Sequence, residues 1–84
     1  MALTQILIAH ETEQGEKVEV PGRISIENGA IFIRIDVPKE DATFPDRSKA
    51  IEKLAKDCEA NGIEHELLFV GRLKLPDCIK IFCK

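Results

Sequence analysis

Tryptophan and tyrosine are both missing from this 84-residue sequence, and its aromatic side chains are four phenylalanines. Protein interfaces and nucleic-acid stacking platforms favour Trp, Tyr and Arg, so only phenylalanine and arginine are available here for such roles. No apolar run approaches the roughly 20 residues of a membrane-spanning helix. The segment Met1–His10 lacks the basic region and the small-residue cleavage site of a signal peptide. We therefore expect no membrane association.

Cysteine is also scarce, with three residues at irregular spacing, Cys58, Cys78 and Cys83. An odd count without a regular pattern is not a disulfide framework, which predicts free thiols in a reducing cytoplasm. We expect Cys58 and Cys83 to point into one core, where cysteine behaves as a small hydrophobe. Cys78 lies five residues before Cys83, so a straight strand places the two on opposite faces, a poor arrangement for a shared metal.

Catalytic motifs are absent from the sequence: there is no glycine-rich phosphate loop and no nucleophile elbow. The two histidines stand beside carboxylates, His10 next to Glu11 and His65 between Glu64 and Glu66. Neighbouring residues on a strand point to opposite faces, so an acid–base or metal site would need the fold to bring the two histidines together. We predict that the protein is not an enzyme and holds no cofactor or metal.

Hydrophobic residues make up 44% of the chain and charged residues 32%, which is typical of a folded globular domain. We interpret residues 1–84 as a single domain, because this length is too short for two. The net charge is −3, and the excess of acid lies in the segment 11–19. Without an overall basic charge, composition does not indicate a nucleic-acid-binding protein.

The strongest local signal is Asn28-Gly29, between the alternating segments Arg23–Glu27 and Ala30–Val37. Asn-Gly supplies the two residues of positive φ in a type I′ turn, which closes a two-residue β-hairpin and sets its register. One face of this hairpin then carries five isoleucines, and we expect that face to pack against a helix. The isoleucine face comprises Ile24, Ile26, Ile31, Ile33 and Ile35, and the other face comprises Arg23, Ser25, Phe32, Arg34 and Asp36.

A helix is predicted over about residues 44–61. Thr43 is expected to cap its first turn, Pro45 fits that turn, and Gly62 is typical of the position just past a helix end. Its apolar stripe consists of Ile51, Leu54, Ala55 and Cys58.

Further strands are predicted at Leu3–His10, Lys17–Val20, Glu66–Val70 and Cys78–Cys83, with a break at Pro21-Gly22. The segment 71–77 allows a strand to continue, with a bulge at Gly71 and a turn at Pro76-Asp77. The expected fold class is α+β: a mostly antiparallel sheet of five to six strands, in the order ββ-ββ-α-ββ, with one helix on one face.

Two functional hypotheses follow. The favoured one is a small non-enzymatic protein-binding module, an inhibitor or adaptor that acts through an exposed sheet face or a strand edge, with a homodimer as one form of edge pairing. Its expected binding residues are Arg23, Phe32, Arg34, Phe82 and Lys80, with Leu68 on the same face. The alternative is a nucleic-acid-binding domain in which Arg23, Phe32 and Arg34 contact phosphate and base, with Arg72, Lys74 and Lys80 nearby. An enzyme built around His10, His65 or Cys78 ranks third.

Overall fold

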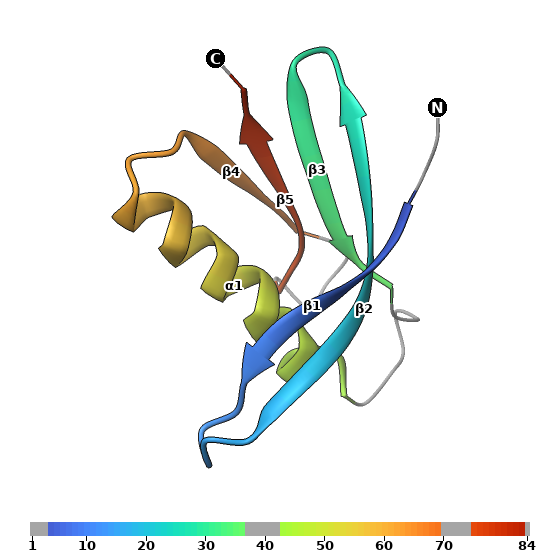
Figure 1. Ribbon diagram of the computed structural model, residues 1–84, viewed down its shortest axis with the longest axis vertical. Helices are drawn as coiled ribbons and strands as arrows, with labels where there is room; N and C mark the ends of the chain where they lie inside the picture. The colour runs from blue at the N-terminus through green and yellow to red at the C-terminus, as the bar shows by residue number, and fades with distance from the viewer. Residues whose placement is uncertain (1–3, 37–42, 70–74, 84) are drawn as a thin grey trace.

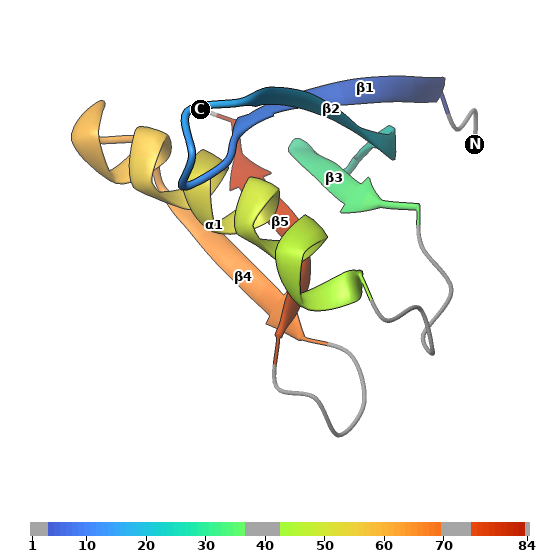
Figure 2. The same ribbon diagram turned by 90° about the horizontal axis from the view of Figure 1, so that it is seen from below.

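The computed structural model describes residues 4–36, 43–69 and 75–83. Within these ranges the elements are β1 (Thr4–Glu11), β2 (Lys17–Glu27), β3 (Ala30–Ile35), α1 (Phe44–Ala60), β4 (His65–Phe69) and β5 (Pro76–Phe82). The five strands form one antiparallel sheet in the spatial order β1-β2-β3-β5-β4. Figures 1 and 2 show α1 lying against one face of this twisted sheet. The predicted α+β class, with one helix on one face of an antiparallel sheet, is confirmed.

The β2–β3 hairpin has the predicted turn and the predicted register. Asn28 and Gly29 have φ angles of 48° and 77°, the left-handed values that a type I′ turn requires. Pairing extends from Glu27 opposite Ala30 back to Gly22 opposite Ile35. The short-range signal was sufficient here because turn chemistry and side-chain alternation specify the same pairing.

Pro21 does not break β2, and the sequence prediction of a break there was wrong. The Pro21 carbonyl accepts a hydrogen bond from the Asp36 amide at 2.9 Å, so the backbone polar groups of Pro21 face β3. Because β3 ends at Ile35, an N–H at position 21 would point to the end of the β2–β3 pairing, where the loss of one hydrogen bond leaves the other pairs intact. A proline is therefore tolerated in this interior strand.

Helix α1 begins at Phe44 with Pro45 in its first turn and ends at the cap residue Asn61, before Gly62 with φ 66°. The expected side-chain cap from Thr43 does not form. Thr43 has φ −87° and ψ −1°, whereas side-chain capping uses an extended backbone at this position. The nearby Ser48 hydroxyl donates to the Pro45 carbonyl at 2.9 Å, a bond that does not cap the free N–H groups.

The hydrophobic core lies between α1 and the middle of the sheet. The predicted helix stripe faces it: Ile51 is fully buried, Ala55 and Cys58 are buried, and Leu54 packs against them. The sheet contributes Ile8, Val20, Ile35 and Ile79. No helix among the described residues is long and apolar enough to cross a membrane.

The isoleucine face of the hairpin is only partly covered, and this corrects the expectation that all five isoleucines would pack against the helix. Ile35 is buried and Ile33 packs at the edge of the core, but Ile26 is 69% exposed. The hairpin extends past the end of the helix-covered region (Figure 1), so its turn end has no helix over it.

At the last strand, Pro76 and Asp77 belong to β5 and do not form the predicted turn. Pro76 pairs with Phe69, and the pairing of β4 with β5 has an irregularity between Leu68 and Phe69. The bulge predicted at Gly71 lies outside the described residues, as do Arg72 and Lys74.

Candidate functional site

The sheet face turned away from α1 is called the open face below. Strand pairing assigns side chains to it, because residues directly opposite each other share a face and Ile79 and Ile35 mark the helix side. In the central part of the sheet, the open face carries Arg23 and Ser25 from β2, Ala30, Phe32 and Arg34 from β3, Cys78, Lys80 and Phe82 from β5, and Glu66 and Leu68 from β4. All five predicted binding residues therefore lie on one face.

Among the predicted binding residues, Lys80 contacts both Phe32 and Phe82. Lys80 lies directly opposite Phe32, and Phe82 is two residues further along the same strand. The Lys80 ammonium is 5.5 Å from the centroid of the Phe32 ring and 4.9 Å from that of Phe82. Both distances are within the range of a cation–π interaction. We call these half-buried residues the Phe–Lys–Phe cluster.

The two predicted arginines are each paired with a carboxylate. Arg23 Nε lies 3.3 Å from Asp36 Oδ2, and Arg34 Nη1 lies 3.9 Å from Asp77 Oδ2. The Arg23–Asp36 pair is exposed, and such surface pairs contribute little to stability, whereas the second pair joins an exposed guanidinium to the buried Asp77 carboxylate. The effect of both pairs on the open face is to neutralise much of the positive charge that a phosphate backbone would need.

The cysteines are free, but they do not share one core. Cys58 is buried in the core as predicted, whereas Cys83 is exposed, contrary to the prediction. β5 ends at Phe82, and the Cys83 amide bonds to the Gly29 carbonyl at the hairpin turn, beyond the helix. Cys78 is buried on the open-face side, opposite Arg34.

Burial makes the two inner thiols poor nucleophiles. Burial raises the pKa of the Cys78 thiol, and the nearby Arg34 guanidinium offsets this only in part. Burial also raises the pKa of Cys58, and the Asp57 carboxylate adds to the rise. Since the thiolate is the reactive form, both groups are protonated and unreactive at neutral pH.

We predict that iodoacetamide modifies one thiol rapidly in the folded protein at pH 7.5. The modified residue should be Cys83, because Cys58 and Cys78 are shielded from solvent and protonated. Peptide mass spectrometry over a time course would identify the modified residue. Labelling in urea, where all three thiols are accessible, would provide the reference rate for each. Rapid modification of Cys78 in the native protein would contradict the burial described here.

The histidines lie on the two edge strands of the sheet, His10 on β1 and His65 on β4. The sheet order therefore keeps them apart, and the site that would need both of them does not form. His65 Nδ1 lies 3.1 Å from the Ile63 carbonyl. Within the described ranges, no group of three or more His, Cys, Asp or Glu side chains is placed to hold a metal.

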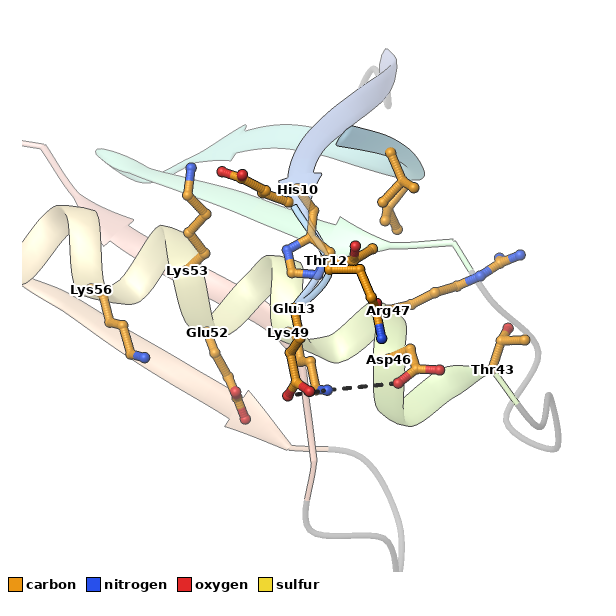
Figure 3. A pocket seen from close by; sticks show the side chains of 14 residues that line it. His10, Thr12, Glu13, Thr43, Asp46, Arg47, Lys49, Glu52, Lys53 and Lys56 are labelled. Carbon is orange, nitrogen blue, oxygen red and sulfur yellow. Dashed lines mark hydrogen bonds and ion pairs between the residues drawn. The ribbon is translucent and has the colours of Figure 1, made fainter. Parts of the chain in front are cut away.

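Sequence reasoning missed a hollow of about 890 Å³ between the β1–β2 loop and the side of α1 that reaches from Asp46 to Lys56 (Figure 3). Lys49 bridges it, with its ammonium 3.5 Å from Glu13 Oε1 and 3.7 Å from Asp46 Oδ1. The charges around it balance: the cations are Arg47, Lys49, Lys53 and Lys56, and the acids are Glu11, Glu13, Asp46 and Glu52. This balance selects neither anions nor cations, so the hollow is a weaker candidate than the open face.

The acidic segment 11–19 was the sequence signal for one wall of this hollow. Sequence periodicity could not show that it meets the lysines of α1, because the orientation of a loop over a helix depends on tertiary packing. His10 also lines the hollow, and its Nδ1 is buried without a hydrogen-bond partner.

Comparison with known proteins returned no match to a family model, to a curated protein or to a solved structure.

Proposed function

We propose that this chain is a non-enzymatic protein-binding module whose partner packs on the open face around the Phe–Lys–Phe cluster. The observation that supports this is the presence of two half-exposed phenylalanine rings beside one ammonium group, on the side of the sheet opposite α1. Aromatic side chains that a partner can desolvate contribute a large part of the free energy of many protein interfaces.

The geometry of the cluster favours a particular kind of partner surface. The rings offer apolar area, and the Lys80 ammonium offers three donors for a carboxylate or a backbone carbonyl. Two rings already restrict the Lys80 side chain, so less conformational entropy is lost on binding. We therefore expect an apolar patch with an acidic group at its centre on the partner.

Nucleic-acid binding by the same face is less well supported. Arg23 and Arg34 are opposite each other, as that hypothesis requires, but carboxylates already lie 3.3 and 3.9 Å from them. A phosphate would have to displace these carboxylates, and the net charge of −3 opposes its approach. An affinity that fell steeply with added salt would favour this alternative.

The non-enzymatic assignment and the cytoplasmic location are parts of the same proposal. The buried Cys58 and Cys78 thiols are protonated, and the histidines lie on opposite edges of the sheet, which argues against catalysis by these two thiols or by a pair of histidines. All three cysteines are free in the structure, as a reducing compartment would keep them. Cell fractionation of the host with an antibody to the chain would test the location.

Substitution of Lys80 by Glu tests the open face. We expect Lys80→Glu and Phe82→Ala each to weaken binding by about tenfold or more, since loss of a hot-spot side chain at the centre of an interface costs about 2 kcal/mol or more. The immobilised wild-type chain would capture partners from a host lysate, and calorimetry would then measure the dissociation constant of the enriched protein for each variant.

Lys56→Glu is the matched control, because it makes the same charge change on an exposed position of α1, on the opposite side of the sheet. It should alter the dissociation constant by less than about twofold. Circular dichroism would show that each variant is folded. Equal binding by Lys80→Glu and the wild type would exclude the open face as the contact surface.

A further inference from the structure

The two edges of the sheet differ in how open they are to another strand. β4 has five residues, a pairing irregularity between Leu68 and Phe69, and a charged side chain at Glu66. β1 has eight residues and pairs regularly with β2 along its whole length. The one charged side chain of β1 is Glu11 at its last position, and the strand contains no lysine, aspartate or proline. Edge strands normally carry charged residues or proline along their length, so β1 is unprotected from Thr4 to His10.

The hydrogen bond of Pro21 identifies the backbone groups of β1 that face outward. The Pro21 carbonyl faces β3, and Pro21 lies opposite Leu7. The N–H and C=O of one residue in an antiparallel strand point to the same side, so Leu7 makes no ladder bonds to β2. By the same alternation, the N–H and C=O groups of Gln5, Leu7 and Ala9 point to the free edge.

The side chains of β1 have a near-palindromic pattern around Leu7. Ile6 and Ile8 flank it, and a small or polar residue follows on each side, Gln5 and Ala9. When two copies lie antiparallel with Leu7 opposite Leu7, Ile6 of each copy lies opposite Ile8 of the other, so apolar side chains meet at the centre. The backbone N–H and C=O groups that point to the free edge then face those of the other copy. Shifting this register so that Ile8 faces Ile8 would place Ile6 opposite His10 of the partner subunit.

We propose that two copies of this chain associate through β1, antiparallel, about a two-fold axis at Leu7. This involves a different surface from the open-face binding proposed above. Leu7 is 63% exposed in the single chain, and in the pair its side chain would contact Leu7 of the partner subunit. The acidic loops that follow Glu11 would lie at opposite ends of the contact, so that no like charges meet.

The pair would form one continuous sheet. A two-fold axis perpendicular to the sheet keeps both helices on the same side, and therefore both Phe–Lys–Phe clusters on the other. A partner with two matching sites would then bind both clusters at once, with a gain in avidity.

Charge substitution at Leu7 tests the pairing and its register. Sedimentation velocity at about 50 µM should give a dimer for the wild type and monomers for Leu7→Lys and Leu7→Glu, because like charges then face each other across the axis. An equimolar mixture of the two variants should again sediment as a dimer. A mixture that stays monomeric would overturn the register, and a monomeric wild type would overturn the pairing.

Two more variants separate pairing from folding. Ala9→Pro removes an N–H that faces the free edge, so it should abolish the dimer while circular dichroism shows a folded chain. Ile26→Lys makes the same charge change as Leu7→Lys at a side chain 69% exposed and away from the edge, and it should remain a dimer. Dissociation by Ile26→Lys, or an unaffected dimer with Ala9→Pro, would contradict pairing through β1.

Discussion

Replacing Ile79 by Ala should lower the free energy of unfolding by about 2–5 kcal/mol, the range for buried isoleucines. Ile79 is fully buried and lies on β5, where it faces Ile33 of β3 on one side and Leu67 of β4 on the other. It also belongs to the cluster formed with the stripe of α1. The substitution therefore leaves a cavity where sheet and helix meet, and urea unfolding followed by circular dichroism would measure the loss.

Ile26→Ala is the control for this prediction, since it makes the same chemical change on the same face of the sheet. Ile26 is 69% exposed, beyond the end of the helix, so we expect a loss below about 1 kcal/mol. Equal losses for the two variants would mean that the hairpin end is covered, in conflict with the fold described above.

Gly22→Ala should lower the free energy of unfolding by about 1–3 kcal/mol, the usual cost of overpacking. A Cβ at position 22 would lie 2.8 Å from the Arg34 carbonyl oxygen and 2.8 Å from Ile8 Cδ1. The Ile8 side chain can shift, but the carbonyl belongs to the paired backbone of β3 and can move only with that strand. Thermal and urea unfolding of the variant would measure the effect.

At an unstrained site, Gly→Ala instead stabilises a protein by about 0.4–1 kcal/mol, because it lowers the conformational entropy of the unfolded chain. A gain of stability by Gly22→Ala would show that β1 and β3 leave room for a methyl group at position 22, in conflict with the distances given above. Ser25→Ala, on the same strand but on the open face, is the reference and should change stability by under about 1 kcal/mol.

Residues close together in the chain specified the features that sequence reasoning predicted correctly. The Asn28-Gly29 turn and the alternation beside it agree on one register, and the helix boundaries follow from Pro45 and Gly62. Placing Phe32, Lys80 and Phe82 on one face also needed only strand alternation. The contact between Lys80 and Phe32 required more, because β5 lies between β3 and β4 in the sheet although it comes last in the chain.

The amino-acid sequence alone determined the fold class, the hairpin with its register, the helix, and the sides of the strands on which isoleucine and phenylalanine lie. Tertiary structure decided that Pro21 is tolerated within β2, that Ile26 and Cys83 are exposed, and that β1 is an open edge. The physical reason is the range of the forces involved. Turn and helix signals act over a few residues, whereas burial depends on where one short helix ends on a larger sheet.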